Sequence, residues 1–483
     1  MFSKAQEEEL MSGKSKSTKP HSAATRELRT KMQGRVVSWG DDDYARRRRV
    51  WNGAVENRPA LFAVCETTAD VQAAVRSARQ HEIPLSVRGG GHDWAGRALC
   101  PDGIVLDLSR MRQVIVDPRS RTAIVSGGTK VKDVAAAAAA HGLVAALGNC
   151  GEVGVAGLAL GGGYGPLNGQ YGLAADNLLG AEVVLADGRC VTTGPDEESE
   201  LFWAIRGGGG NFGAVTSMRI QLHEMRHMIA GSIGYSLSEA EPALHRYAAF
   251  AASMPDELGI SVGMTSGPDG QLLLMFLPLW NGDKQRGERI ISDFQALGTP
   301  RLAQVGQMTY SDMLTLFDAW LAAADGCHWE TRTRSLPTLL PGVIDVITRA
   351  VAGKTSPYSM VNWHHLHGAA TRIPAKEIAF GLRQEHFMVE IIAGWKPDGS
   401  NGLPHRQWAQ DLWKSLAPFA LPGGYANLLG PDDREQAAAA YGDNAARLRA
   451  LKRRFDPDGI FASAIPLPEG PMPPGSGGPS ATP

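Results

Sequence analysis

A histidine and a cysteine, each beside glycine-rich backbone, are the residues of this sequence best suited to chemistry. His92 ends the segment SVRGGGH at residues 86–92, and Cys150 lies in GNCGEVGVAG at residues 148–157. Glycine has no Cβ and reaches positive φ at little cost, so such backbone can approach a ligand closely. An imidazole and a thiol in these places suggest two attachments to a single cofactor. Taken singly, His92 would be a buried hydrogen-bonded histidine and Cys150 a small core residue.

A third glycine cluster, GGGGNFG at residues 207–213, contains the spacing Gly-x-Gly-x-x-Gly of a dinucleotide-binding fingerprint. A Rossmann site needs a strand before this run and a helix after it. Here the order is reversed, because residues 202–206 are typical of a helix and residues 214–222 of a strand. The sequence therefore excludes a classical NAD-binding fold, although successive N–H groups of the glycines can still form a nest for an anionic ligand.

Composition and charge narrow the class of protein. The 483 residues suffice for two or three domains, and 43% hydrophobic with 20% charged residues is typical of globular chains. A formal net charge of −2 favours neither a nucleic-acid partner nor a membrane partner, and no apolar run is long enough to span a bilayer. The five cysteines contain no Cys-x-x-Cys pair. We therefore expect no disulfide framework and a reducing, cytoplasmic location.

The elements that must position these residues mix helices and strands, which predicts an α+β fold. In the first half, the expected strands are 59–65, 84–87, 103–108, 122–126, 179–185 and 214–222, and the expected helices are 68–81, capped by Thr68, 131–141 and 200–206. From about residue 226, apolar strands predict a larger sheet. Its expected strands are 229–237, 259–265, 271–279, 358–367 and 385–394, and the expected helices are 283–296, 310–324, 404–416 and 435–455.

The glycine-rich motifs together resemble one known family. They are VRGGGH at 87–92, GNCGEVGVAG at 148–157, LGGGYG at 160–165, GLAADN at 172–177, FWAIRGGGGNFG at 202–213, YAN at 425–427 and YGDNAARL at 441–448. From Trp51 to Ile465 the chain is similar to the berberine bridge enzyme-like FAD-linked oxidases of the vanillyl-alcohol oxidase superfamily. The resemblance implies a two-domain PCMH-type FAD-binding fold, whose substrate domain is a large antiparallel sheet backed by helices.

The resemblance also divides the chain. We expect an FAD-binding domain at residues 50–225, completed by a C-terminal segment at 420–466, and a substrate-binding domain at 226–419. The polar residues 1–40 and the Pro- and Gly-rich tail 467–483 are expected to be disordered extensions.

FAD is the cofactor that the resemblance implies, bound through two covalent bonds. His92 would carry the flavin 8α-methyl group and Cys150, as a thiolate, would bond flavin C6, which places the chain in the bicovalent subclass. Other residues of the motifs are expected to contact FAD: Arg88, Gly89, Gly90, Gly91, Asp93, Gly154, Val155, Gly157, Gly161, Asn211, Gly213, Val215, Asn427 and Asn444.

The reaction that the resemblance implies is an oxidation with O₂ as acceptor. A hydride leaves a C–H bond of a small alcohol, sugar or amine for flavin N5, and O₂ reoxidises the flavin to give H₂O₂. Val153, a small residue three positions after Cys150, would leave room for O₂. Two alternatives stay open, namely an oxidative cyclase or tailoring enzyme of secondary metabolism and a flavin- or ligand-binding protein without turnover. The expected partners are a small-molecule substrate and O₂, and the sequence predicts no oligomeric state.

Three residues are candidates for catalysis. Glu390, five residues before Trp395, matches the place where relatives carry a catalytic Glu or Gln; otherwise it would be a solvent-facing strand carboxylate. Tyr164 matches an active-site tyrosine, or else packs in the core. Tyr425 begins a Tyr-x-Asn motif whose fourth residue is Leu428, where relatives carry Tyr. This departure favours Glu390 as the base that takes a proton from the substrate.

His365 and His367 share one face of the expected strand at 358–367, a spacing that could bind a metal ion. No acidic or cysteine partner is evident nearby, and a flavin oxidase needs no metal. We therefore expect these two histidines in the substrate pocket and expect no metal site.

Overall fold

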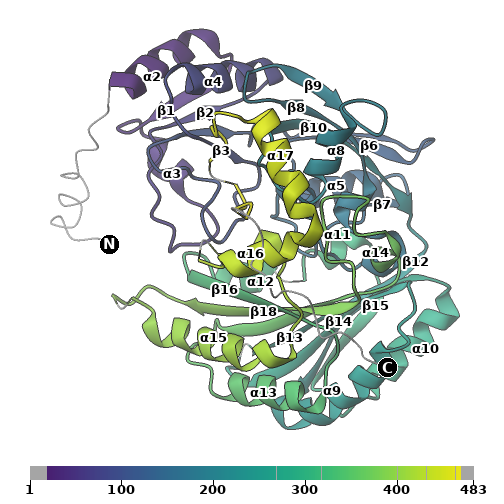
Figure 1. Ribbon diagram of the computed structural model, residues 1–483. Coiled ribbons are helices and arrows are strands. Elements are labelled where there is room, and N and C mark those ends of the chain that lie inside the picture. The colour runs from purple at the N-terminus through teal and green to yellow at the C-terminus, as the bar shows by residue number, and fades with distance from the viewer. Residues whose placement is uncertain are drawn as a thin grey trace, which may run out of the picture.

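In the part of the chain that the structure describes, the strands form sheets of four, five, seven and two strands (Figure 1). The computed structural model describes residues 19–468 apart from positions 268, 317, 400, 431 and 463. The four- and five-stranded sheets come from the N-terminal half and lie on one side of the seven-stranded sheet. The mixed helix and sheet content, with one large antiparallel sheet, confirms the predicted α+β class.

The four-stranded sheet holds the turn that ends at His92. Its order is β1-β2-β4-β3, with β2, β4 and β3 parallel and β1 antiparallel to β2. The strands are β1 Arg35–Ser38, β2 Leu61–Val64, β3 Leu85–Arg88 and β4 Ile104–Asp107. Helix α4 (Thr68–Gln80) makes the crossover from β2 to β3 that parallel strands require. It begins at the cap Thr67, rather than at the predicted Thr68, because the Thr67 hydroxyl accepts a hydrogen bond from the Asp70 N–H at 3.2 Å.

The five-stranded sheet has the order β5-β6-β10-β8-β9, and its neighbouring strands are antiparallel. Its strands are β5 Val114–Asp117, β6 Thr122–Ser126, β8 Leu178–Val184, β9 Cys190–Thr193 and β10 Ala214–Gln221. The helices in the segments that connect these strands are α5 Val131–Ala139, α6 Val155–Leu160, α7 Asn168–Tyr171 and α8 Ser199–Ile205. The two-stranded pair is β7 Leu143–Val144 with β11 His223–Glu224. Helix α8 precedes the glycines at 207–213 and β10 follows them, which confirms that the order is the reverse of a Rossmann turn.

The seven-stranded sheet is antiparallel throughout, with the order β15-β12-β14-β13-β17-β18-β16. Its strands are β12 His227–Ser236, β13 Leu258–Ser266, β14 Leu272–Gly282, β15 Leu302–Gln307, β16 His328–Leu336, β17 Met360–Leu366 and β18 His386–Trp395. Helices pack on its outer face: α9 Leu237–Ala251, α10 Lys284–Gln295, α13 Pro341–Ala352 and α15 Leu403–Ser415. This leaves the inner face free to meet the smaller sheets, as Figure 1 shows.

The C-terminal segment returns to the N-terminal half of the molecule (Figure 1). Phe461 bridges to Leu85 of β3, and the Lys452 ammonium donates to the carbonyl oxygen of Asn211 at 2.9 Å. The elements of this segment are η3 Ala426–Leu428, α16 Arg434–Tyr441, η4 Gly442–Asn444 and α17 Ala445–Phe455.

The remaining helices lie elsewhere in the chain. They are α2 Lys19–Lys31, α3 Tyr44–Arg48, η1 Ala174–Asn177, α11 Tyr310–Met313, α12 Asp318–Ala323, α14 Ala369–Arg372 and η2 Ala417–Phe419.

The structure corrects several predicted elements. Residues 19–40 are not disordered, because α2 buries Ala24 and Leu28 against α4 and β1 pairs with β2; residues 1–18 and 469–483 lie outside the described residues. The expected helix at 435–455 is interrupted at Gly442, whose φ of +47° ends α16. The expected helix at 310–324 is divided into α11 and α12. Strand β16 was not predicted, because its alternation includes charged residues. Among the described residues, no helix has the length and apolarity that crossing a membrane requires.

Candidate active site

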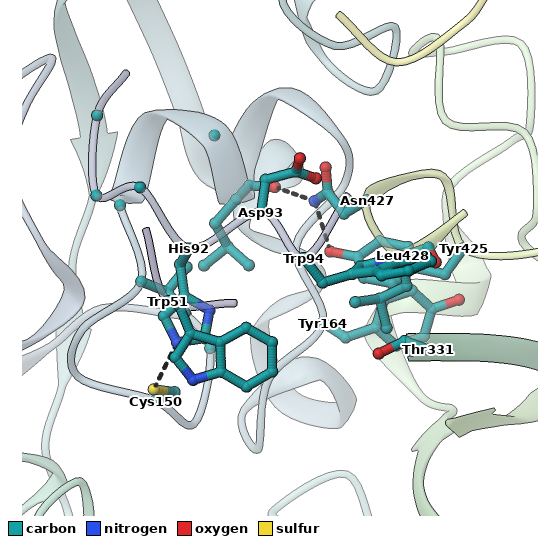
Figure 2. A pocket seen from close by; sticks show the side chains of 18 of the residues that line it. Trp51, His92, Asp93, Trp94, Cys150, Tyr164, Thr331, Tyr425, Asn427 and Leu428 are labelled. Carbon is teal, nitrogen blue, oxygen red and sulfur yellow. Dashed lines mark hydrogen bonds between the residues drawn. The ribbon is translucent and has the colours of Figure 1, made fainter. Parts of the chain in front are cut away.

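One cavity of about 510 Å³ lies between the smaller sheets and the inner face of the seven-stranded sheet. Its volume is in the range of small-molecule and cofactor sites. The N-terminal half lines it with the turn at 89–94, the segment 148–158 and the glycines near 210. Strands β13, β14, β16, β17 and β18 line the opposite side, and residues 425–428 close one end. Figure 2 shows the cavity with His92, Trp51 and Cys150 on one side and Tyr425, Asn427 and Leu428 on the other.

The structure brings His92 and Cys150 together at the wall of this cavity. The Cys150 Sγ atom lies 3.7 Å from the His92 Nε2 atom (Figure 2). The ring of His92 stacks on Trp51 with centroids 4.9 Å apart, and Trp51 stacks in turn on Trp329 at 5.0 Å. Burial lowers the pKa of His92 to about 4, so its imidazole is neutral near pH 7. A neutral ring nitrogen is thus in position to accept the thiol proton.

The thiol of Cys150 is protonated in this setting. Burial raises its pKa above the ordinary value of 9, although the backbone N–H groups of Glu152 and Val153 oppose the rise. Reactive cysteines instead have a lowered pKa. The thiolate that a bond to flavin C6 requires therefore needs a group that takes the thiol proton, and His92 Nε2 is the ring nitrogen beside it.

Gly90 and Gly154 must both be glycines, because the backbones of the two motifs touch at these positions. A Cβ atom on Gly90 would lie 2.4 Å from the Gly154 backbone nitrogen, and a Cβ on Gly154 would lie 2.4 Å from the Gly90 nitrogen. Any side chain at either position would push the two loops apart. This close approach of backbone to backbone is what sets the separation of His92 and Cys150.

The lining fits the FAD that the sequence resemblance implies. Gly157 and Gly210 both line the cavity, and a Cβ atom on either would meet no atom within 4 Å. Side chains there would project into open space that only a ligand could use. The residues predicted to contact FAD that line the cavity are Gly89, Gly90, Gly91, His92, Asp93, Cys150, Gly154, Gly157, Gly213, Val215 and Asn427, and Val153 lines it beside them.

Glu390 lies across the cavity from these loops, on the inner face of β18. It pairs in register with Asn362 of β17, and its side chain is 17% exposed. Burial raises the pKa of Glu390 to about 7, while a hydrogen bond from the Asn362 side chain opposes that rise. The His364 Nε2 atom is 3.9 Å from Glu390 Oε1. A carboxyl group whose pKa is close to neutrality suits a general base.

Tyr164 and Tyr425 both line the cavity, with ring centroids 4.6 Å apart. The Tyr425 hydroxyl accepts hydrogen bonds from Asn427 Nδ2 at 2.8 Å and from the Gly163 N–H at 3.2 Å. The Tyr164 hydroxyl is 2.8 Å from His386 Nε2. Burial raises the pKa of both phenols, that of Tyr425 to about 12. Both are therefore neutral near pH 7, where they can position groups by hydrogen bonds.

Five residues predicted to contact FAD do not line the cavity. The guanidinium of Arg88 instead donates to the carbonyl oxygens of Arg47 and, at 2.9 Å, Arg49. The other four contribute to the packing around the cavity. Val155 is fully buried in the core, and a Cβ on Gly161 would overlap the Asn427 side chain. The Asn211 amide donates to the carbonyls of Gly208 and Ile465, and the Asn444 amide donates to those of Ala375, Ile378 and Ala379.

His365 and His367, which were predicted to belong to the substrate pocket, do not line this cavity. Side chains alternate along β17, so Met360, Asn362 and His364 line the cavity. His365 lies on the opposite side, where its ring stacks on Phe387 with centroids 4.3 Å apart and its Nε2 atom is 2.9 Å from Glu385 Oε1. The histidine of β17 that lines the cavity is therefore His364.

Other residues of the lining were not identified from the sequence. They include Trp51, Trp94, Trp329, Thr331, Asn149, Ser261, Asn362 and His364. Asn362 and His364 could have been predicted from the alternation of side chains along β17. This would have required Glu390, on the neighbouring strand, as the reference for which residues face inward. Trp329 and Thr331 could not be found in this way, because the strand that carries them was not recognised.

Comparisons with known proteins agree with this geometry. A model described as an FAD binding domain matches residues 59–194, and one described as berberine and berberine-like matches residues 424–468. (R)-6-hydroxynicotine oxidase from Paenarthrobacter nicotinovorans is 29% identical over 455 residues, which cover 89% of this chain and 95% of that protein. The crystal structure of 6-hydroxy-D-nicotine oxidase from Arthrobacter nicotinovorans is 30% identical with a TM-score of 0.81 and covers 90% of this chain and 98% of its own. A glucooligosaccharide oxidase from Acremonium strictum shares the fold at 21% identity, with a TM-score of 0.81 over 92% of this chain and 99% of its own.

Proposed function

The chain belongs to the berberine bridge enzyme-like family of FAD-linked oxidoreductases, and from that premise we propose that it is an oxidase that carries FAD on both His92 and Cys150. Residues 50–225 and 420–466 would hold the cofactor, and residues 226–419 would hold a small alcohol, sugar or amine. The observation that carries the proposal is that His92, Cys150 and the buried carboxyl group of Glu390 line one cavity.

The double attachment rests on the 3.7 Å separation of His92 Nε2 and Cys150 Sγ. Both groups can then reach one edge of a single ring system. Forming each bond removes one hydrogen from the side chain and one from the flavin, and O₂ takes up the electron pair. The Acremonium strictum oxidase carries a 6-S-cysteinyl, 8α-N1-histidyl FAD, which is the same pair of residue types.

When bound, FAD supplies the acceptor for a hydride and returns the electrons to O₂ as H₂O₂. The chain's own residues provide the proton transfer and the positioning. Ionised Glu390 takes a proton from the substrate N–H or O–H group, and the hydroxyl groups of Tyr164 and Tyr425 orient that group. Since the pKa of Glu390 is about 7, its basic form is present above pH 7 and is lost progressively below it.

The wall of the cavity favours a substrate with an apolar body. Around Glu390, the inner face of the sheet presents the apolar Met275, Leu277, Met360, Met388 and Ile392 beside the polar Ser261, Asn362 and His364. Among the described residues of the lining, the only lysine or arginine is Arg97, and Asp93 holds it through an ion pair of 2.6 Å. An aromatic amine or aromatic alcohol would leave few of its polar groups unpaired there, whereas an oligosaccharide would leave many.

Two experiments test the proposal. Protein precipitated with acid should stay yellow, and Cys150→Ala should keep the flavin through His92 but change its absorption spectrum. Cys190→Ala, a partly exposed cysteine of β9, is the matched control and should leave the spectrum unchanged. Colour that washes out of the precipitated wild type would refute the covalent attachment.

The second experiment follows H₂O₂ release over a panel of aromatic amines, aromatic alcohols and oligosaccharides. We expect turnover with a member of the first two groups. Turnover confined to oligosaccharides would contradict the argument from the apolar wall, and flavin reduction without H₂O₂ release would contradict the assignment of O₂ as acceptor.

A further inference from the structure

A row of four polar side chains runs from the Cys150 loop across the inner face of the sheet to Glu390. Asn149 Nδ2 lies 3.4 Å from Ser261 Oγ, and Ser261 Oγ lies 3.1 Å from His364 Nδ1. His364 Nε2 lies 3.9 Å from Glu390 Oε1. Ser261 and His364 are direct cross-strand partners on β13 and β17, and Glu390 is the diagonal neighbour of His364 on β18. All four residues line the cavity.

The hydrogen bonds of this row have a direction. The amide nitrogen of Asn149 can only donate, so Ser261 Oγ accepts there and its own O–H proton is free to be donated onward. The group within reach of that proton is His364 Nδ1, which accepts it in the tautomer that leaves Nδ1 unprotonated. Burial lowers the pKa of His364 to about 4, so near pH 7 the ring carries a single proton. With Nδ1 accepting, that proton is on Nε2, the atom that faces Glu390.

Few other ionisable groups face this carboxyl group. Asn362, its partner on β17, donates a hydrogen bond but does not titrate, and Thr333, its partner on β16, is likewise uncharged. Tyr425, on the turn before η3, interacts with Glu390 but has a pKa raised to about 12, so it is neutral. Tyr164 is neutral for the same reason. Asn362, Thr333, Tyr425 and Tyr164 are thus all uncharged near pH 7, and the Nε2 atom of His364 lies beside them, 3.9 Å from Glu390 Oε1.

We propose that His364 is a positioning residue for Glu390: the chain of donors from Asn149 through Ser261 holds its Nε2–H toward the carboxylate and favours the ionised, proton-accepting form. This role rests on the proposed oxidase function, in which Glu390 is the base. It also links the base to the loop that carries Cys150, because Asn149 is the neighbouring residue. A shift of that loop would alter the donor to Ser261 and, through it, the tautomer of His364.

A pair of substitutions tests the effect on catalysis. In His364→Leu the donor is lost, so the acid limb of the kcat/KM profile should move to higher pH by roughly 0.5–1 pH unit. In His364→Gln an amide N–H can occupy the place of Nε2–H, so the profile should stay within about 0.3 pH unit of the wild type. Ser261→Ala should move the limb in the same direction as His364→Leu but by less. An unmoved limb in His364→Leu, or an equal shift in His364→Gln, would overturn the proposal.

A second readout requires no substrate. Long-range ¹H–¹⁵N spectra of protein labelled with [¹⁵N]histidine report the tautomer of His364, whose resonances are those absent from His364→Gln. We expect a protonated Nε2 and an unprotonated Nδ1, with a change in their shifts near pH 7 that disappears in Glu390→Gln. A ring protonated on Nδ1, or a titration unchanged in Glu390→Gln, would refute the inference.

The two readouts separate the inference from the proposed function. If no substrate is turned over but the His364 resonances titrate with Glu390, the oxidase assignment fails while the contact between the two residues stands. If turnover occurs and the tautomer is wrong, the oxidase assignment stands and the role of His364 falls.

Discussion

Replacing Glu390 with Gln should abolish catalysis and stabilise the protein at the same time. Burial raises the pKa of this carboxyl group from its ordinary 4.5 to about 7. Ionising Glu390 in the folded protein therefore costs about 3 kcal/mol more than ionising it in the unfolded chain. An uncharged amide of the same shape avoids that cost and keeps an oxygen to accept the hydrogen bond from Asn362.

The pH dependence of this stabilisation has a definite sign. Below pH 4.5 the carboxyl group is protonated in both the folded and the unfolded state, and the wild type bears no penalty. Between pH 4.5 and 7 only the unfolded chain releases the proton, so the stability of the wild type falls as pH rises. Above pH 7 the loss is complete. Glu390→Gln should thus gain up to about 3 kcal/mol in free energy of unfolding at pH 8 and little at pH 5.

Two assays check this prediction on the same samples. Denaturant unfolding of the two proteins at pH 5 and pH 8 measures the stabilisation, and kcat/KM at pH 8 should fall by roughly 10²–10⁴-fold with flavin content unchanged. Glu385→Gln is the matched control for activity, since Glu385 lies beside the same strand but its side chain is 54% exposed and contacts His365 outside the cavity. A wild-type rate in Glu390→Gln, or an equal gain in stability at both pH values, would refute the reasoning.

Three further predictions concern two residues that line the cavity and one that does not. Val153→Leu adds one carbon to the lining. In stopped-flow measurements at fixed O₂, this variant should reoxidise its flavin more slowly than the wild type, while substrate should reduce the flavin at an unchanged rate. Equal reoxidation rates would count against Val153 as an oxygen-access residue. Gly157→Ala should be tolerated because its Cβ meets no atom within 4 Å, whereas Gly157→Leu should lower the flavin-to-protein absorbance ratio; full flavin content in the leucine variant would show that this space is not used. Arg88→Met should lower the melting temperature, because two backbone carbonyls lose their donor, without changing the flavin spectrum; a changed spectrum would return Arg88 to the cofactor site.

The residues of β17 and β18 that line the cavity show what the alternation of side chains along a strand can and cannot predict. Alternation puts His386, Met388 and Glu390 on one face; Met388 and Glu390 line the cavity, whereas His386 lies behind it, 2.8 Å from the Tyr164 hydroxyl. Alternation alone does not say which face is inward, because both faces of this sheet are covered. The helices α9, α13 and α15 pack on one face and the cavity lies on the other, so the apolar residues of β17 gave no indication of which side His365 would take. Packing decided that His364 lies beside Glu390 and that His365 lies against Phe387.

Order near the N-terminus could not be read from local composition. Residues 19–31 are polar enough to be expected as a disordered segment, yet Ala24 and Leu28 are one helical turn apart and are fully buried against α4. The carboxylate of Asp70 adds hydrogen bonds from the backbone N–H groups of Gln33 and Gly34. These contacts join residues about 37 positions apart, so no local pattern could have predicted them.

The sequence by itself determined the reversed order of helix and strand around the glycines at 207–213 and the α+β fold, because these follow from local backbone preferences. The cofactor class was implied by the resemblance of the glycine-rich motifs to a known family. Only the tertiary structure decided how those motifs meet. The contact of Gly90 with Gly154 sets His92 3.7 Å from Cys150, and the packing of helices on the outer face turns Glu390 and His364 inward. Burial, which no single segment can specify, then brings the pKa of Glu390 to about 7.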